Sequence, residues 1–323
     1  MKRREFIGLL GGAAAWPLTA SAQPADGKLV TIGILAMEPW PSIDAFRHAL
    51  DARGYIEGKN VRFVYRYAKG HNERLPELAN ELVGLNVDVI FTWRTDAVLA
   101  AKQATATIPI VMGVIGDLLG SGIVTNLARP GGNITGCSLR VAELEGKRLQ
   151  LLKEVVPGLS RVAILLNPTN HYMPLVRESV RKGAEVLHLW LAFYEVYDTI
   201  TLDAAFVTLT KDRPNAFLVP ADTFLVSQRS RIAQFAIENK LPSLYTFREY
   251  IEAGGLIAYA PNYPDLFRRA ASYVDKILKG AKPGELPIER SNTFQLFINL
   301  KTARALGLTV PPKLLAIADE IIE

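Results

Sequence analysis

The stretch from Val87 to Asp117 limits the possible folds of this chain more than any other part of the sequence. It begins with Val87–Phe91, an apolar run rich in β-branched residues and too short for a helix of its own, which predicts a strand buried on both faces. A turn follows, in which Thr95 or Asp96 is the expected N-cap of a helix, and Ile110–Ile115 is a second apolar run. The stretch is therefore one β–α–β unit, the building block of a parallel sheet.

The same alternation of strands and helices runs through the whole chain. Leu29–Leu35 and Asn60–Tyr67 are further predicted strands, so the first part reads β-α-β-α-β-α-β. After Ser138 the pattern restarts, with Arg161–Leu166 as the next predicted strand. We therefore expect an α/β protein with two open, parallel-sheet, Rossmann-like lobes joined by a hinge. Such lobes enclose a cleft lined by the loops at the ends of their strands, where small ligands bind.

A glycine-rich passage, Gly116–Gly136, separates the two parts of the chain. It lacks the Gly-Lys-Ser/Thr of a P-loop, and its glycines do not follow a strand and open a helix at dinucleotide-binding spacing. We interpret it as turns around a short helix, Ile123–Ala128, where the chain crosses between lobes.

Composition and motifs argue against several classes of function. The formal net charge of +5 over 323 residues is mild, and no basic stripe interleaved with aromatic residues occurs, so we expect no nucleic-acid binding. The single cysteine, Cys137, excludes an intramolecular disulfide. The four histidines share no metal-ligand spacing with each other or with Cys137, and no GxSxG or Cys–His nucleophile motif is present. We expect no catalysis, no metal site and no cofactor.

The first 22 residues have the three parts of an export signal. A basic start is followed by an apolar centre from Phe6 to Trp16 and by small residues ending in Ala20-Ser21-Ala22, after which cleavage is expected. Paired Arg3-Arg4 before Glu5-Phe6-Ile7 resembles a twin-arginine signal, and an ordinary Sec signal is the alternative. Since no later stretch is suited to spanning a bilayer, we expect a mature periplasmic protein without a membrane anchor.

Ordered stretches along nearly the whole chain resemble one known family. They include RREFIGLLGG, GYIEGKNVRFVYRY, NLARPGGNITG, GKRLQLLKEVVPGLSRVAILLNP and FQLFINLKTARALGLTVPP. No single motif is diagnostic, but the ordered set is similar to the extracytoplasmic substrate-binding proteins of ABC transporters, which have the type I periplasmic-binding fold. Within that family the chain resembles the branch related to tryptophan- and tyrosine-binding receptors.

The resemblance implies two lobes, three crossings of the chain between them and a small ligand enclosed in the cleft. It assigns residues 29–136 plus about 260–290 to the N-terminal lobe, and 137–259 plus about 291–323 to the C-terminal lobe. The implied ligand is an amino acid, aromatic or branched, or an aromatic acid, and the implied partner is an ABC permease that the protein meets transiently, as a monomer. A sensory receptor for a membrane kinase or chemoreceptor would have the same lobes, and an exported cofactor enzyme is a further alternative.

Polar residues on loops after the strands are candidate ligand contacts. Thr95 offers its hydroxyl and adjoining N–H groups to a carboxylate, or serves only as a helix cap. Asp222 and Asp117 could each pair with a ligand amine, or could be turn or N-cap residues. Asn167, before Pro168, is equally a ligand contact or a turn residue.

Four aromatic residues complete the candidate site. Trp40 and Trp93 follow predicted strands and could stack on an apolar or aromatic ligand, and Trp40 lies between two prolines, which favours a fixed loop. Phe247 and Tyr259 could line the second side of the pocket.

Overall fold

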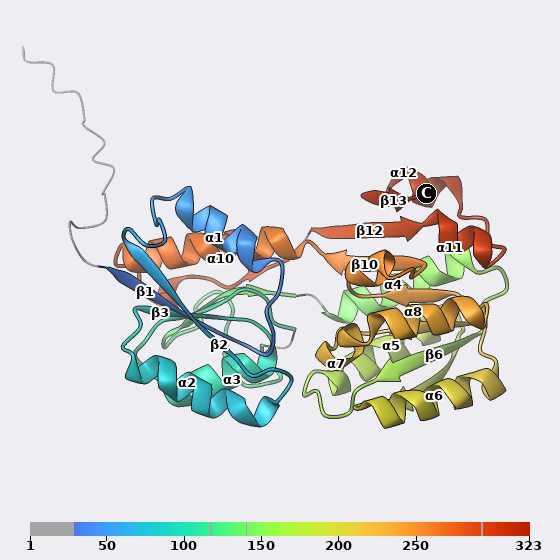
Figure 1. Ribbon diagram of the computed structural model, residues 1–323, viewed down its shortest axis with the longest axis horizontal. Coiled ribbons are helices and arrows are strands. Elements are labelled where there is room, and N and C mark those ends of the chain that lie inside the picture. The colour runs from blue at the N-terminus through green and yellow to red at the C-terminus, as the bar shows by residue number, and fades with distance from the viewer. Residues whose placement is uncertain (1–28, 117, 140, 292) are drawn as a thin grey trace, which may run out of the picture.

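The computed structural model describes residues 29–116, 118–139, 141–291 and 293–323, which form two α/β lobes side by side (Figure 1). The predicted export signal, residues 1–22, and the candidate ligand residue Asp117 lie outside the described residues. The fold class predicted from the sequence is confirmed, because each lobe has an open, largely parallel sheet with helices on both faces.

The sheet of the first lobe has six strands in the order β11-β5-β4-β3-β1-β2, and all neighbouring strands in it are parallel. The edge strand β11 comes from a part of the chain far beyond the other five strands in the sequence. The strands are β1 (Val30–Ala36), β2 (Val61–Tyr67), β3 (Val89–Thr92), β4 (Ile110–Met112), β5 (Ile134–Ser138) and β11 (Glu289–Arg290).

Helices cover both faces of this sheet. On one face α1 (Ile43–Asp51) packs beside α10 (Tyr263–Leu278), and on the other α2 (Leu75–Gly84) packs beside α3 (Thr95–Ala104) (Figure 1). Short 3-10 turns lie at Asn72–Arg74 (η1) and Pro283–Glu285 (η2). Each face has its own apolar core, so the central strands are buried on both sides, as their unbroken apolar runs predict.

The sheet of the second lobe has seven strands in the order β13-β12-β10-β9-β8-β6-β7. All neighbours are parallel except β10 and β12, which pair antiparallel. The strands are β6 (Arg161–Leu166), β7 (Trp190–Glu195), β8 (Ala216–Val219), β9 (Ser243–Tyr245), β10 (Ile257–Pro261), β12 (Phe294–Asn299) and β13 (Glu320–Ile322).

Helices cover this sheet on both faces as well, over two separate apolar cores. The first core holds α4 (Val141–Val155), α5 (Met173–Leu187), α11 (Leu300–Ala305) and α12 (Pro312–Ala316), and the second holds α6 (Thr199–Asp212), α7 (Thr223–Ser227), α8 (Arg229–Glu238) and α9 (Glu249–Glu252). Helices α4 and α5 cross at Gly146 and Gly183. A Cβ on Gly183 would lie 2.8 Å from the Cα of Gly146, so Gly183 has no room for a side chain at this contact.

In the described part of the chain, three segments connect the lobes. The chain leaves the first sheet after β5, returns to it between β10 and α10, and leaves again between β11 and β12. The segments are bonded to one another: the N–H of Asn262 donates to the carbonyl of Thr293 (3.1 Å), and that of Ser291 to the carbonyl of Ser138 (2.8 Å). The residue limits assigned to the lobes from the sequence stay a prediction.

A buried ion pair lies beside these connecting segments. Nη1 of Arg148 donates to Oε1 of Glu145 at 2.5 Å, and Nε of Arg148 donates to the carbonyl of Tyr259 at 3.0 Å. The two charged side chains are 4% and 1% exposed. Burial raises the pKa of Glu145, and the positive charge of Arg148 opposes that rise.

The glycine-rich passage differs from its prediction, since the helix expected at Ile123–Ala128 is absent. Ile123 and Val124 are buried in the core under α2 and α3, and the backbone around them makes turns instead. The segment lies between Gly122, which has a positive φ, and Pro130. It is too short to form a helix between these two residues.

Candidate functional site

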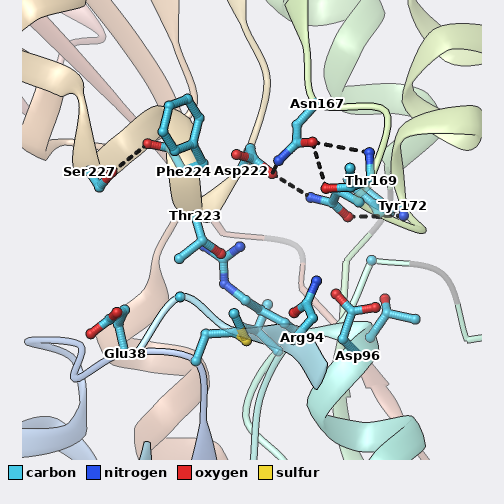
Figure 2. Close-up of a pocket in the computed structure, with 18 of the residues that line it drawn as sticks. Glu38, Arg94, Asp96, Asn167, Thr169, Tyr172, Asp222, Thr223, Phe224 and Ser227 are labelled. Atoms are coloured by element: carbon cyan, nitrogen blue, oxygen red, sulfur yellow. Dashed lines mark hydrogen bonds between the residues drawn. The ribbon is translucent and has the colours of Figure 1, made fainter. Parts of the chain in front are cut away.

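A cavity of about 300 Å³ lies between the lobes, among the loops at the carboxyl ends of their strands (Figure 2). This is the position at which open α/β sheets bind ligands. Its wall on the first lobe comes mainly from the loop after β1 and the turn between β3 and α3. Its wall on the second lobe comes from the loops after β6, β8 and β9, and Tyr263, at the start of α10 of the first lobe, also lines it.

The turn between β3 and α3 presents Arg94 to the cavity. The N-cap of α3 is Arg94, so the prediction of Thr95 or Asp96 as the cap is wrong. Arg94 has φ +70° and ψ 149°, in a region that is essentially reserved for glycine and costs about 1–3 kcal/mol for other residues. This conformation turns the chain sharply from strand to helix. Thr95, which is only 6% exposed, then lies in the first turn of α3 and lines the cavity.

Asp222 organises the opposite wall. It is the N-cap of α7, where its Oδ1 accepts from the N–H of Leu225 at 2.9 Å. Its Oδ2 accepts from Nδ2 of Asn167 at 3.1 Å and from Nδ2 of Asn170 at 3.0 Å (Figure 2). Asn167 in turn accepts from the N–H and hydroxyl of Thr169. The two residues therefore act as cap and turn residues while they face the cavity, and ligand contact by either stays a prediction.

Aromatic rings line the side of the cavity near the connecting segments. The ring of Trp40 lies 4.6 Å from that of Tyr263 and 5.7 Å from that of Phe247, measured between centroids. Behind Trp40, the ring of Trp93 is 1% exposed and packs against Phe267. A second cavity, of about 360 Å³, shares Trp40 and Arg94 with the first and is lined in part by Trp93.

Direct contacts join the lobes around the cavity. Nδ1 of His171, in the second lobe, lies 2.6 Å from Oδ1 of Asp96, in the first. The ring of Tyr172 packs against the backbone of Gly116, and a Cβ on Gly116 would lie 2.1 Å from that ring. The lobes are thus close together, and Gly116 has no room for a side chain in this arrangement.

Arg94 carries the positive charge of the site. Its guanidinium lies 5.9 Å from the ring centroid of Trp40 and 6.0 Å from that of Phe247, so it stands between the lobes. Burial lowers the pKa of Arg94, and the negative charge of Asp222 is the main influence that opposes this. An arginine stays protonated at neutral pH even so. Burial also raises the pKa of Tyr263, so its hydroxyl is neutral there.

Five of the predicted contact residues line the main cavity. They are Trp40, Thr95, Asn167, Asp222 and Phe247. Trp93 lies behind them in the aromatic cluster, and Tyr259 lines neither cavity, because it lies on β10 with its ring 5.7 Å from that of Phe294. The fourth polar candidate, Asp117, is outside the described residues. Whether any of these residues binds ligand stays a prediction.

Sequence reasoning missed other residues of the cavity wall. Arg94 stands between the two candidates Trp93 and Thr95, and Asn170 and Tyr172 follow Asn167 in the same loop. The strand-end position of these loops is the signal that could have included them. In the described ranges, no group of three or more His, Cys, Asp or Glu residues could hold a metal ion, and no helix is long and apolar enough to cross a membrane.

Two α/β lobes, three connecting segments and a polar and aromatic cavity between them define a protein that holds a small ligand between lobes. The sequence model of the ABC transporter substrate binding protein family matches residues 40–322, and the chain belongs to that family. Members of this family are substrate-binding transport proteins rather than enzymes, with a small-molecule ligand and a permease as partner.

Characterised relatives agree with this assignment. A tyrosine-binding protein of Clostridioides difficile is 25% identical over 285 residues, which are 87% of this chain and 82% of that protein. The structure of an ABC domain from Streptococcus pneumonia in complex with L-Trp is 25% identical and has a TM-score of 0.84, over 91% of this chain and all of that chain (100%). A ligand-free, open substrate-binding protein from Clostridium difficile, 23% identical, has a TM-score of 0.69 over 91% of this chain and 99% of that one.

Proposed function

We propose that this protein binds an amino acid with an aromatic or branched side chain, or an aromatic acid, and delivers it to an ABC permease. The observation that carries this proposal is the lining of the cavity, which combines aromatic rings with side chains of positive and negative charge. Its volume of about 300 Å³ is at the small end of ligand pockets, which suits a solute of amino-acid size.

The polar walls suit the two charged groups of an amino acid. On the first lobe, the hydroxyl of Thr95 and the free N–H groups at the start of α3 favour a carboxylate. On the second lobe, Asp222 accepts three hydrogen bonds and retains roughly one of its four acceptor positions for an ammonium group. A ligand lying across the cavity can therefore present opposite charges to the two lobes.

The aromatic wall suits an apolar body between those groups. Trp40, Phe247 and Tyr263 come from both lobes and lie within 5.7 Å of one another between centroids. Rings arranged in this way add favourable contact area and exclude water from a ligand that lies against them. The tyrosine-binding relative and the L-Trp complex support an aromatic amino acid as the first choice.

We propose that binding closes the lobes around the solute by hinge motion. The contacts of His171 with Asp96 and of Tyr172 with Gly116 can form only when the lobes are close together. The higher TM-score to the L-Trp complex than to the ligand-free, open protein supports a closed arrangement here. Closure would then present a recognisable surface to the permease.

The place of action that we propose is the periplasm, with the protein acting as a monomer. The support comes from the sequence of residues 1–22, which has the parts of an export signal and a paired arginine typical of the twin-arginine route. N-terminal sequencing of the exported protein should begin at Gln23. Export that persists when the twin-arginine translocase is blocked would favour the Sec route instead.

Isothermal titration calorimetry of the mature protein tests the ligand class directly. The titrants are L-tryptophan, L-tyrosine, L-leucine and 4-hydroxybenzoate. The purified protein is first dialysed extensively. At least one should bind one-to-one with micromolar or tighter affinity. A hundredfold excess of that solute over its Kd should raise the unfolding temperature by roughly 5 °C. If none of the four binds, the proposed ligand class is wrong.

A further inference from the structure

Arg94 occupies a backbone position that favours glycine, and local movement cannot relieve the strain. Its N–H donates to the carbonyl of Val114 at 3.0 Å, which fixes it to the loop after β4. Its carbonyl accepts from the N–H of Val98 at 3.1 Å, which fixes it to α3. A residue other than glycine that is held at φ +70° beside a cavity suggests that its side chain has a use there.

The side chain itself is a half-buried cation that pairs with no counterion among the described residues. It extends from the turn across the cavity toward Thr223 (Figure 2), and its guanidinium lies beside the rings of both Trp40 and Phe247. Among the residues that the structure describes, its guanidinium forms neither an ion pair nor a side-chain hydrogen bond. All of its N–H donors therefore remain available, and burial makes an unpaired charge costly.

The two acidic side chains whose charges act on Arg94 have other partners. Asp222 accepts hydrogen bonds from Asn167, Asn170 and the N–H of Leu225. Asp96 lies in contact with His171. In the described part of the chain neither carboxylate forms an ion pair with the guanidinium, so its N–H donors are open to an anion from outside the chain.

We infer that Arg94 binds a carboxylate group of the ligand and is the residue that makes this protein select acids. The guanidinium offers a planar pair of N–H donors that matches a carboxylate, which a lysine or a helix terminus does not. Arg94 lines both cavities, so the carboxylate lies where they meet, with the body of the ligand against Trp40 and Phe247. This inference rests on the proposed function and specifies the chemistry of the same site.

Matched pairs of acid and amide test the inference, because each pair differs only in the carboxylate. The pairs are L-tryptophan with L-tryptophanamide, L-tyrosine with L-tyrosinamide, and 4-hydroxybenzoate with 4-hydroxybenzamide. The natural protein should bind the acid of a recognised pair at least about 10-fold more tightly than the amide, as expected for loss of a charge-assisted contact. In Arg94→Gly the two affinities should come within about 3-fold of each other.

Two further variants separate the guanidinium from charge in general. Arg94→Lys keeps the cation but loses the planar pair of donors, so its preference for the acid should lie between those of the natural protein and Arg94→Gly. Arg231→Ala removes a cation of α8 that lines neither cavity and should leave the preference unchanged.

The possible outcomes distinguish the inference from the function on which it rests. If neither L-leucine nor any acid of the three pairs binds the natural protein, the proposed ligand class and the role of Arg94 both fail. If an acid binds but Arg94→Gly keeps the full preference over the amide, the role of Arg94 alone is wrong. Circular dichroism and the unfolding temperature of ligand-free Arg94→Gly check that the variant is folded.

Discussion

His171 and Asp96 join the two lobes through a contact of 2.6 Å between Nδ1 and Oδ1. The aspartate comes from the first turn of α3 and lines the cavity, and the histidine comes from the loop before α5, so the pair joins the lobes beside the cavity. The Asp96 side chain is 18% exposed, whereas that of His171 is 70% exposed. Such a contact can form only in the closed arrangement, and it is weak because water reaches one partner.

We predict that His171→Ala weakens ligand binding by about 2- to 5-fold. An exposed pair of this kind contributes about 0.2–1 kcal/mol, and here it stabilises the closed form alone. The loss should be seen mainly as faster ligand release in stopped-flow fluorescence. His71→Ala is the matched control, since it removes an exposed His71–Glu73 contact within one lobe. Equal effects of the two variants would mean that the lobe-joining contact has no special role.

Replacement of Gly116 should interfere with closure more strongly. A Cβ in Gly116→Ala would lie 2.1 Å from the ring of Tyr172, and the lobes would have to separate to relieve that overlap. We expect affinity for the ligand to fall by at least about 10-fold, while the ligand-free protein keeps its stability because the open form has room. Gly84→Ala, at a helical glycine with no atom near the added Cβ, should leave binding unchanged. Small-angle scattering with ligand measures closure in both variants.

Much of the fold could be predicted because buried parallel strands have an unmistakable pattern. The runs at Val89–Phe91 and Val162–Leu166 are apolar without alternation, and they lie in strands covered on both faces. The same logic placed Asn167 and Asp222 at the cavity, because both follow parallel strands whose carboxyl ends meet at one edge.

The remaining features depend on information that residue patterns do not carry. Arg94 was missed because a positive φ at a residue other than glycine cannot be read from the sequence, and an arginine in a turn normally points into water. Trp93 and Trp40 both follow strands, so the sequence does not distinguish them. The path of the loops buries Trp93, whereas it places Trp40 in the wall of the first cavity. Contacts such as Tyr172 with Gly116 depend on the angle between lobes, which no local pattern determines.

The strain at Arg94 predicts an unusual order of stability. Arg94→Gly and Arg94→Ala both lose the guanidinium and its contacts with the rings, but only glycine adopts φ +70° without cost. We expect Arg94→Gly to be more stable than Arg94→Ala by about 1 kcal/mol in urea unfolding of the ligand-free protein. The reverse order holds inside a helix. At Lys102, within α3, the alanine variant should therefore be more stable than the glycine variant by about 1 kcal/mol. If alanine is the better residue at both positions, the backbone of Arg94 is not strained.

The buried pair of Glu145 and Arg148 should dominate stability beside the connecting segments. Arg148→Met leaves the carboxylate of Glu145 in a site where it is 1% exposed, and such losses typically reach about 3–5 kcal/mol. The double variant Glu145→Leu with Arg148→Met removes both charges and should recover most of that loss.

The single variant should also have a characteristic pH dependence. Burial already raises the pKa of Glu145 above its usual 4.5, and loss of Arg148 removes the charge that opposes this rise. An acid whose pKa is higher in the folded state stabilises the fold while it is protonated, below the pKa of the unfolded chain, and loses that contribution as the pH rises through the folded value. Arg148→Met should therefore lose more stability, relative to the natural protein, at pH ~8 than at pH ~4. Urea unfolding at the two pH values measures the difference. If the loss of stability is the same at both pH values, or if the double variant does not reduce it, Arg148 acts through its bond to the Tyr259 carbonyl instead.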